Sequence, residues 1–368
     1  MKSSQGCLTE ITYSFATGGS ERIALAIAAE AMEQGVTTTA CATHGGYGPV
    51  SDHLRELGVS CEAVQLGFGG RVGRAVRLFL HFRRNRTRIA HVHHFDMASI
   101  IYWPARLAGV RRVVITEHTD YALRTRPRAF RLARRYGSLA DLTTVVHQGI
   151  ADYLVSEVGL DPASVRVVVN GVDTSRFLPG HDLSLRDKLG ASRDACVVGS
   201  VGRLHPDKDP MNLLQAIASL DPDVRRGLHI LIVGDGPSRH QVLRFVEEQS
   251  IGESVRFLGE RHDIAELMGA MDVFVLPSRT EGLPVALLEA MSCGLPSVAT
   301  DVGGVAAVLG DAGIMVAPED AQALADGLAV YAADREKASL DGKRARQRAV
   351  ALFDRSVMLS GYREALWG

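Results

Sequence analysis

The feature that most constrains the fold of this chain is a regular alternation of short apolar runs with longer helical patterns. Runs such as "RRVVITEH" and "LHILIVGDG" are almost continuously apolar, which is typical of strands buried on both faces of a parallel sheet. The alternation begins again after "NGVDTSRFLPG", where turn-forming residues crowd together. We therefore expect two doubly wound α/β domains joined near residues 171–190. The runs assigned as strands are "LTEITYSF", "RIAHVHHF", "RRVVITEH", "DLTTVVHQ", "VRVVVNG", "ACVVGSVGR", "LHILIVGDG", "SVRFLGE", "DVFVLPS" and "LPSVATDVGG".

Length and composition agree with this organisation and exclude several classes of protein. A chain of 368 residues is long for one compact core, so two domains are the better expectation. Its five cysteines are widely spaced and form no Cys-x-x-Cys pair, which indicates neither a disulfide framework nor a zinc site. The first residues lack a signal-peptide pattern, and no apolar run approaches the roughly 18 residues of a membrane span. We expect a cytoplasmic protein that is not integral to a membrane.

Charge is distributed unevenly along the chain. Residues 1–180 carry 21 Lys and Arg against 15 Asp and Glu, whereas the remainder is acidic. The first half is therefore expected to favour acidic surfaces or substrates. Its basic residues form two tracts: Arg74, Arg77, His81, Arg84 and Arg88 at helical spacing, then Arg124, Arg126, Arg128, Arg131, Arg134 and Arg135. The helix that carries the first tract also has an apolar face, which we expect to pack on the sheet. Its residues are Val72, Val76, Phe79 and Leu80.

Two interpretations of the basic tracts stay open. The arginines could simply be solvated residues on the outer faces of helices. Alternatively, the first domain could dock on an anionic membrane at the inner face of the cell membrane. An acidic polysaccharide is another possible anionic partner of these tracts. We expect no nucleic acid partner.

In doubly wound sheets, ligands bind at the carboxyl ends of the strands, so loops that follow strands are the candidate sites. Gly18 and Gly19 follow the first strand and open a helix, where backbone N–H groups can approach an anion, although a plain tight turn explains them equally well. In "VGRLHPDKDP", Arg203 and Lys208 could hold a diphosphate, the guanidinium through two hydrogen bonds and the ammonium as a point charge. Unrelated charges on a solvated turn are the alternative.

The segment "DVFVLPSRTEGLPVALLEAMSCG" places two glutamates around a predicted strand, loop and helix. Pro284 and Gly294 mark the two ends of the helix, so Glu281 lies in the loop before it and Glu289 lies inside it. Both carboxylates could face the same ligand at different depths and accept hydrogen bonds from sugar hydroxyls. The N–H groups after Gly282 would face a phosphate. A solvated helical position is a poor alternative for Glu289 because its neighbours are apolar.

Two groups of residues look like metal ligands: Asp207 with Asp209, and His91, His93 and His94. We expect no metal at the aspartates because Lys208, between them, already supplies positive charge. Alternation along a strand directs His91 and His93 to one face and His94 to the other, and no cysteine or carboxylate completes a site in the sequence. His118 is different, since "TEHT" ends a strand at the ligand-binding edge, and we interpret it as a ligand contact rather than a structural residue.

The ordered motifs resemble those of glycosyltransferase family 4. They are "GGSER", "HVHH", "TEHT", "VVVNGVDTSRF", "VGRLHPDK", "VGDGP", "FLGE" and "EGLPVALLE", the last of which is the family's Glu-x7-Glu. The resemblance covers nearly the whole chain and implies a retaining nucleotide-sugar glycosyltransferase. The implied α/β fold is GT-B, with two facing Rossmann-like domains and an interdomain cleft. The implied domains are residues 1–175, joined by a C-terminal helix at about residues 350–368, and residues 176–349.

The resemblance also implies roles for residues of this chain. The donor diphosphate would be bound by Arg203 and Lys208, and the ribose hydroxyls by Glu289. The transferred sugar would be contacted by Glu281 and His118, and "RFLGE" would contact the base through its backbone. The implied catalytic residues are Glu281, His118, Arg203 and Lys208, and the implied donor-binding residues are Gly18, Gly19, Arg203, Lys208, Gly234, Phe257, Leu258, Glu281, Gly282, Leu283 and Glu289. We expect a UDP-linked sugar as donor, a lipid-linked or saccharide acceptor that the first domain could reach by docking on the membrane, no cofactor and no metal. Arg124, Arg126 and Arg128 would lie on the acceptor side.

One departure from the family and three other functions bear on this interpretation. The segment "DKDP" stands where the family often has Lys-Gly, but both cations are kept. A sugar-nucleotide 2-epimerase has a similar architecture, although it gives no reason for the Glu-x7-Glu pair. A sugar-nucleotide binding protein without catalysis is a further alternative. A dinucleotide oxidoreductase is suggested only by "VGDGPSRH", where Pro237 interrupts the glycine pattern.

Overall fold

The computed structural model describes residues 7–16, 18–64, 70–180 and 182–368, and the chain divides into two compact units. The first unit comprises residues 1–170 and 356–368, and the second comprises residues 171–355. The divisions expected from the sequence, at 175/176 and 349/350, differ by a few residues because the last long helix of the second unit runs on to Leu352. The signal-peptide interpretation rested partly on residues 1–6, which lie outside the described residues.

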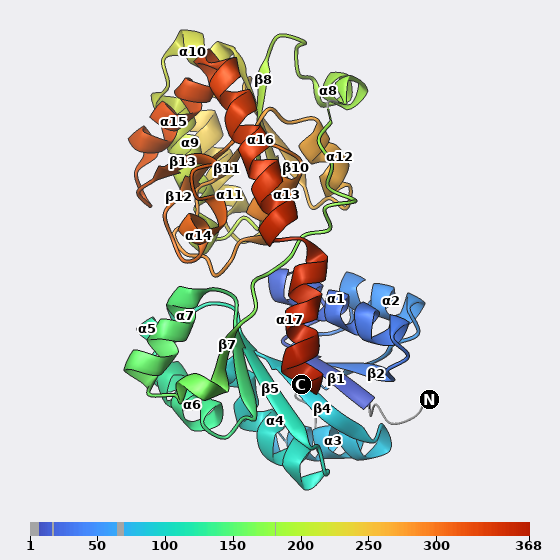
Figure 1. Cartoon of the computed structure of the whole chain (residues 1–368). Helices are drawn as coiled ribbons and strands as arrows, with labels where there is room; N and C mark the ends of the chain where they lie inside the picture. The colour runs from blue at the N-terminus through green and yellow to red at the C-terminus, as the bar shows by residue number, and fades with distance from the viewer. Residues whose placement is uncertain (1–6, 17, 65–69, 181) are drawn as a thin grey trace. The chain divides into compact units, whose positions relative to one another are not determined.

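The first unit is built on a seven-stranded parallel sheet of order β3-β2-β1-β4-β5-β6-β7 (Figure 1). Its strands are β1 (Cys7–Thr12), β2 (Thr38–Ala42), β3 (Ser60–Ala63), β4 (Thr87–His93), β5 (Arg112–Glu117), β6 (Leu142–Val145) and β7 (Val165–Val167). Its helices are α1 (Gly19–Glu33), α2 (Pro49–Glu56), α3 (Gly70–Arg84), α4 (Phe95–Leu107), α5 (Tyr121–Thr125), α6 (Pro127–Gly137), α7 (Gln148–Tyr153), the π-helical turn η1 (Leu154–Val158), the 3₁₀ turn η2 (Pro162–Ser164) and α17 (Arg355–Trp367).

The second unit contains a six-stranded parallel sheet of order β10-β9-β8-β11-β12-β13. Its strands are β8 (Cys196–Val201), β9 (Leu228–Val233), β10 (Val255–Gly259), β11 (Val273–Leu276), β12 (Ser297–Thr300) and β13 (Gly313–Val316). Its helices are α8 (Leu183–Leu189), the 3₁₀ turn η3 (Pro206–Lys208), α9 (Pro210–Ser219), α10 (Pro222–Arg226), α11 (Arg239–Glu248), α12 (Ile264–Gly269), α13 (Val285–Ser292), α14 (Val305–Leu309), α15 (Ala321–Ala333) and α16 (Arg335–Leu352).

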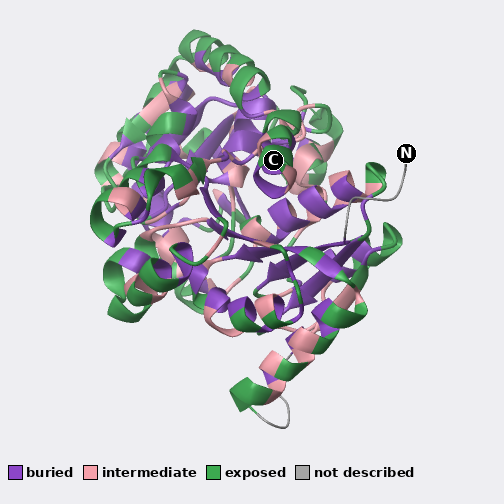
Figure 2. Cartoon of the chain, turned by 60° about the horizontal axis from the view of Figure 1, so that its bottom comes forward, coloured by how far each residue is buried: buried purple, intermediate pink, exposed green. Residues whose placement is uncertain are grey.

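Burial follows the pattern that the apolar runs predicted. The central strands β1 and β9 are buried at every residue, and Figure 2 shows strands mostly in purple while many helices carry green outward faces. The C-terminal helix α17 packs on the core of the first unit, with Met358 and Tyr362 among the buried side chains around Leu8 and Val114. The sequence therefore predicted two parallel sheets correctly. No helix among the described residues is long and apolar enough to cross a membrane.

Three strands were missed in the sequence, and each has a local reason. The run "TTACA" of β2 is short and consists of Thr, Ala and Cys, so it carries no strong apolar signal. Strands β3 and β13 form one edge of each sheet and are only partly buried. The sequence "SCEA" of β3 has no apolar run, and "GIMV" of β13 is only four residues long and was not assigned as a strand. Their absence from the prediction changed the number of strands and left the fold class unaffected.

The expected orientation of α3 was wrong. Its predicted apolar face is exposed at three positions, with 74% of Val72, 50% of Val76 and 45% of Leu80 accessible. Two members of the predicted basic stripe, Arg74 and His81, are buried instead. The helix therefore presents an apolar stripe outward, in the opposite sense to that expected from its sequence.

Specific partners explain why the polar residues of α3 are buried. Arg74 donates from Nη1 to Nε2 of His44 at 3.1 Å, and His81 Nδ1 lies 2.7 Å from a carboxylate oxygen of Glu62. Buried polar groups are tolerated when they have such partners. Arg88, the last member of the expected stripe, lies on β4 because α3 ends at Arg84.

Candidate functional site

Five loops of the second unit meet at the carboxyl ends of neighbouring strands. Because all pairs in this sheet are parallel, the loops after β10, β9, β8, β11 and β12 lie along one edge. Backbone hydrogen bonds join them in sequence: Gly234 N to Gly259 O, Leu204 N to Asp235 O, Arg279 N to Asp207 O, and Gly304 N to Gly282 O. Loops held in this way can fix side chains around a ligand.

Lys208 and Glu281 form the central charged pair of this edge. Lys208, in η3 after β8, donates from Nζ to both carboxylate oxygens of Glu281, at 2.7 and 2.6 Å. Ser278, two residues beyond β11, donates its hydroxyl to Glu281 Oε1 at 2.7 Å. Glu281 is only 7% exposed, although it lies in the loop before α13 as the sequence predicted. The surrounding hydrogen bonds compensate for burying its charge.

Arg203 occupies the same loop as Lys208 but in a different environment. Its side chain is exposed and has no hydrogen bond or ion pair with any described residue. The loop thus provides one cation engaged with a carboxylate and one cation open to solvent. An exposed guanidinium is suited to bidentate hydrogen bonding with a phosphate.

The two aspartates of "DKDP" have separate structural partners. Asp209 caps α9 by accepting a hydrogen bond from Asn212 N, and it also accepts one from Arg279 Nε at 2.7 Å. An oxygen of Asp207 lies 3.2 Å from His205 Nδ1. These contacts give both aspartates a role in shaping the loop, and the expectation that they bind no metal stays a prediction.

Close backbone contacts explain two glycines of the edge. Gly234 of "VGDGP" has φ of +130°, and a Cβ there would lie 2.0 Å from the carbonyl oxygen of Gly202. Gly303 of "DVGG" has φ of +56°, and a Cβ there would lie 2.0 Å from the carbonyl oxygen of Glu281. Any side chain at either position would push the loops apart. The sequence singled out Gly234 as a donor contact but missed Gly303, for which the "GG" after a strand was the available signal.

Helix α13 positions the second glutamate as the sequence suggested. Its N-cap is Pro284, and Gly294 follows its C-terminus with φ of +73°. Glu289 lies inside the helix and is buried, as is Leu283 in the preceding loop. The first N–H groups of α13 have no partner within the helix and are therefore available to an anion.

The remaining predicted residues of the second unit lie at the other end of the same edge. Phe257 and Leu258 are half-buried in β10, directly before Gly259. Since Gly259 accepts a hydrogen bond from Gly234, the predicted base loop is adjacent to "VGDGP". The second unit therefore brings together every site residue that the sequence predicted within it.

In the first unit the predicted residues follow β1 and β5. Gly18 is the N-cap of α1 in an extended conformation and Gly19 is the first residue of the helix. Their loop follows β1, and His118 follows β5; both strands pair in parallel with β4, so the two loops lie along one edge of the sheet. Of the predicted acceptor-side residues, Arg124 lies on α5, Arg126 lies between the two helices and Arg128 lies on α6.

Four residues form a hydrogen-bonded network, which we call the histidine network and define as Glu10, His91, His93 and His118. Glu10 on β1 lies 3.0 Å from His91 Nδ1 and 2.9 Å from His93 Nε2, both on β4. His93 Nδ1 lies 2.8 Å from His118 Nε2. Glu10, His91 and His93 are at most 1% exposed. The expectation that no carboxylate accompanies the histidines was therefore wrong, because β1 pairs with β4 and brings in Glu10.

Three members of the network could in principle hold a cation. The nearest ligand atoms of Glu10, His91 and His93 lie within 4.8 Å of one another. Direct hydrogen bonds already join these atoms, and His91 Nε2 is in addition 2.6 Å from Thr116 Oγ1. The hydrogen bonds account for the cluster without a metal, so the expectation of no metal site stays a prediction.

His94 differs from the other histidines of "HVHH". It lies just beyond β4, with φ of +83°, as the N-cap of α4. Its Nδ1 is 2.7 Å from Glu117 Oε1, and this carboxylate also accepts a hydrogen bond from the backbone N–H of Phe95. Burial lowers the pKa of His94, but the charge of Glu117 outweighs it and raises that pKa to about 9. His94 is therefore a cation at neutral pH.

Two models of protein families match most of the sequence. Residues 17–176 match the model described as "Glycosyltransferase Family 4", and residues 195–334 match that described as "Glycosyl transferases group 1". The chain belongs to glycosyltransferase family 4. This membership confirms the family inferred from the ordered motifs, and the two parallel sheets are those of a GT-B fold.

Relatives of this chain include two curated bacterial enzymes. One is the UDP-Gal:alpha-D-GlcNAc-diphosphoundecaprenol alpha-1,3-galactosyltransferase of Escherichia coli, 32% identical over 62% of this chain. Another is the D-inositol 3-phosphate glycosyltransferase of Saccharomonospora viridis, 36% identical over 59% of this chain. The matched parts span 62% and 54% of the lengths of these relatives.

A solved structure with the same fold is that of Anabaena Alr3699/HepE in complex with UDP-glucose. It has a TM-score of 0.87 and 21% sequence identity, and the match covers 98% of each chain. At this identity the likeness concerns the fold, and it extends over both units of the chain.

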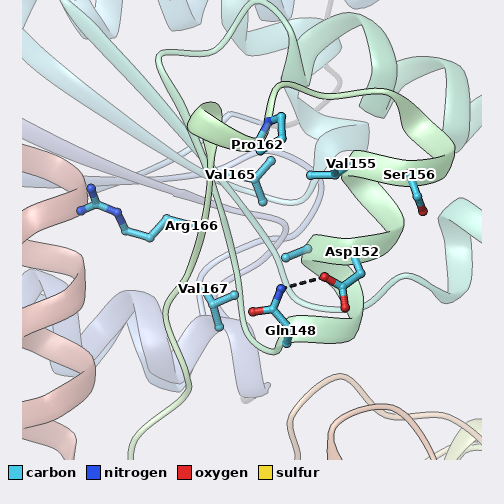
Figure 3. Close-up of a pocket in the computed structure, with 9 residues that line it drawn as sticks. Gln148, Asp152, Val155, Ser156, Pro162, Val165, Arg166 and Val167 are labelled. Carbon is cyan, nitrogen blue, oxygen red and sulfur yellow. Dashed lines mark hydrogen bonds between the residues drawn. The ribbon is translucent and has the colours of Figure 1, made fainter.

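Two surface hollows lie away from the predicted site residues. One, of about 640 Å³, lies between β7 and α7, where Gln148 donates a hydrogen bond to Asp152 (Figure 3). The other, of about 680 Å³, lies near the start of β8 and β11, at Cys196 and Val273. Neither hollow is lined by a residue that the sequence assigned to the site.

The free energy of unfolding of the first unit is expected to decrease as the pH falls below 7. Burial and nearby His91 lower the pKa of His93 from 6.5 to about 4. At a pH between these two values His93 is protonated in the unfolded chain and neutral in the folded chain. We expect the free energy of unfolding to drop by about 2 kcal/mol from pH 7 to pH 5. Both tryptophans, Trp103 and Trp367, lie in this unit, so their fluorescence in urea titrations reports its unfolding.

The control for this measurement is a His93→Gln variant. Glutamine does not titrate, so the variant should lose less stability than the wild type over the same pH interval. Equal pH dependence in the two proteins would contradict the assignment of a neutral, buried His93.

Proposed function

We propose that this protein is a retaining glycosyltransferase that transfers a sugar from a nucleotide diphosphate sugar, with UDP as the nucleotide, to a lipid-linked or saccharide acceptor. The acceptor hydroxyl would attack the anomeric carbon on the face from which the nucleoside diphosphate departs. The reaction would need no metal, because cationic side chains supply the charge that balances the leaving diphosphate. A role in the synthesis of cell-surface polysaccharide or glycolipid follows from this acceptor class.

The observation that carries the proposal is the Lys208–Glu281 pair, held among five connected loops with Arg203 open to solvent beside it. Arg203, Lys208 and the first N–H groups of α13 would stabilise the negative charge that develops on the leaving diphosphate. The carboxylates of Glu281 and Glu289 would accept hydrogen bonds from the sugar and the ribose. His118, in the first unit, would contact the transferred sugar.

The names of relatives support the substrate classes. The Escherichia coli relative is named as a transferase from UDP-Gal to a diphosphoundecaprenol-linked sugar, and the Anabaena protein was crystallised with UDP-glucose. We therefore expect a UDP-sugar as donor and a membrane-borne diphosphate lipid as one class of acceptor. We expect the protein to meet such an acceptor at the inner face of the cell membrane.

A screen of donors and acceptors tests the proposal. Purified protein is incubated with UDP-, GDP-, ADP- and dTDP-sugars together with a polyprenyl-diphosphate saccharide or a free saccharide, in the presence of EDTA. We expect release of UDP and a glycosylated product whose anomeric configuration, measured by NMR, equals that of the donor. Epimerised sugar nucleotide without glycosylated product would indicate an epimerase, and binding without turnover a non-catalytic protein. Inversion, or loss of activity in EDTA, would contradict retention or metal independence.

A surface on the first unit suits docking on an anionic membrane. Helix α3 exposes Val72, Val76 and Leu80 at positions i, i+4 and i+8, with Arg71 and Arg84 exposed near its ends. Helix α4 packs against α3 on one side and α6 on the other. Helix α4 exposes two apolar side chains, Trp103 and Leu107. Helix α6 adds a basic face formed by Arg128, Arg131, Arg134 and Arg135. Apolar side chains flanked by arginines match the chemistry of an anionic lipid surface.

Vesicle co-sedimentation tests this docking. We expect salt-sensitive binding to vesicles that contain phosphatidylglycerol and none to phosphatidylcholine alone, since each arginine near the surface contributes about 1 kcal/mol. Replacing Arg126, Arg128 and Arg131 together should reduce binding, whereas replacing the exposed Arg193 and Arg226 of the second unit should not. Arg124 is a weaker test because it already pairs with Asp120 at 2.6 Å. Absence of binding at low salt would favour a soluble acceptor.

A further inference from the structure

The histidine network has a fixed direction of hydrogen bonding, which follows from its partners. A carboxylate can only accept hydrogen bonds, so Nε2 of His93 must donate to Glu10 across 2.9 Å. A neutral imidazole carries one N–H group, so Nδ1 of His93 is then an acceptor. Its partner at 2.8 Å, Nε2 of His118, must therefore donate. This leaves Nδ1 of His118 as an acceptor, and no described residue hydrogen-bonds to it.

The surrounding charges maintain these protonation states. The contacts with His91 and His93 outweigh burial and lower the pKa of Glu10, which keeps it ionised. Burial, together with the cation of His94, lowers the pKa of His118 well below its ordinary value. The rings of His93 and His118 are stacked, with centroids 5.1 Å apart and an angle of 12° between their planes. His118 is thereby held neutral and in one orientation.

From this geometry we propose that Glu10 and His93 are positioning residues, which hold His118 as the neutral Nε2–H tautomer so that its Nδ1 accepts a hydrogen bond from a hydroxyl of the transferred sugar. The inference rests on the proposed function, in which His118 contacts that sugar. It also specifies the contact: a sugar hydroxyl can donate to Nδ1, whereas the carboxylate of a uronic acid would face an acceptor and be disfavoured. A donor with a neutral, hydroxylated sugar is therefore expected.

The protein offers a matched pair of variants, because His91 and His93 are both fully buried, both contact Glu10, and only His93 contacts His118. In His93→Gln the amide lies near the position of Nε2, where it can still donate to Glu10, and no acceptor is left at the position of Nδ1 opposite His118. In His91→Asn the amide can also still donate to Glu10, and the partner that is lost is Thr116. Each variant thus removes one hydrogen-bond partner at a buried position, and only one of them affects His118.

The primary test is the tautomer of His118, read from two-bond ¹⁵N–¹H correlation spectra of histidine-labelled full-length protein and assigned with a His118→Gln variant. We expect the Nε2–H form in the wild type and in His91→Asn, and loss of that single form in His93→Gln. A wild-type His118 with its proton on Nδ1 would overturn the proposal. This readout does not require turnover, so it decides the proposal even if the protein transfers no sugar and the proposed function fails.

The second test is kinetic and uses the donor and acceptor found active with the wild type. Misplacing a contact group typically costs tenfold to a hundredfold in rate, so we expect turnover to fall by about that factor in His93→Gln and to stay within about threefold in His91→Asn. Equal losses in both variants, with equal losses of stability, would indicate a purely structural role and overturn the proposal.

A metal bound at Glu10, His91 and His93 is the remaining alternative. Full-length protein is dialysed against Zn²⁺, and its metal content and histidine spectra are measured. We expect no stoichiometric zinc and unchanged spectra. One equivalent of zinc, with Nδ1 of His91 and Nε2 of His93 coordinated, would contradict the hydrogen-bond network.

Discussion

Replacing Glu281 with glutamine is expected to lower the turnover of sugar transfer at least a hundredfold. The carboxylate accepts hydrogen bonds from Lys208 and Ser278, and an amide can accept on only one of its two positions. The variant would displace Lys208 from the place where charge develops on the leaving diphosphate, which costs roughly 3 kcal/mol in the transition state. Initial rates of nucleoside diphosphate release measure the effect.

The control for Glu281→Gln is Ser278→Ala, which removes one hydrogen bond to the same carboxylate and keeps its charge. Its turnover should fall by no more than about tenfold. Lys208 is 38% exposed at its side chain, so water can solvate it in Glu281→Gln and the fold should persist. Near-normal turnover in a folded Glu281→Gln protein would contradict the assignment of Glu281 to the site.

Replacing Arg203 with alanine is expected to have an effect of similar size on turnover and almost none on stability. The side chain is exposed and has no partner among the described residues, so its loss leaves the loop intact. In the reaction, however, the diphosphate would lose one of its two side-chain cations, again about 3 to 4 kcal/mol. Turnover and thermal unfolding are measured in parallel.

Two further variants separate charge from geometry at Arg203. Arg203→Lys keeps the charge and loses the planar fork, so it should recover only part of the activity. Arg226→Ala removes an exposed arginine from α10, the helix that precedes β9, and should leave turnover unchanged. If Arg203→Ala and Arg226→Ala behaved alike, Arg203 would not bind the donor.

The sequence predicted those parts of the protein that depend on local patterns. Continuous apolar runs identified most strands and showed that the sheets are parallel, because only strands covered on both faces have this composition. The position of a loop directly after a strand then predicted the common edge on which Arg203, Lys208 and Glu281 lie. Ser278 and Gly303 were missed, since serine and glycine are common in the turns that follow strands whether or not a ligand binds there.

Features that depend on strand order could not be predicted in this way. Glu10 and His91 are 81 residues apart, and only the pairing of β1 with β4 brings them together. The prediction of how α3 is oriented failed for a related reason. Its apolar and basic residues both repeat with helical spacing, so either face could have packed on the sheet. Buried partners on other elements decided the orientation by satisfying Arg74 and His81.

The central claim is that the loops around Lys208 and Glu281 bind the diphosphate of a nucleotide sugar, and calorimetric titration of the full-length protein tests it most directly. The titrants are UDP, GDP, ADP and dTDP, each in the presence of EDTA, and the proteins are the wild type, an Arg203→Ala/Lys208→Met double variant and Arg226→Ala. We predict one UDP site in the wild type and in Arg226→Ala, with affinity at least a hundredfold weaker in the double variant. Equal affinity in all three proteins, or no binding of any of the four nucleotides by the wild type, would contradict the claim.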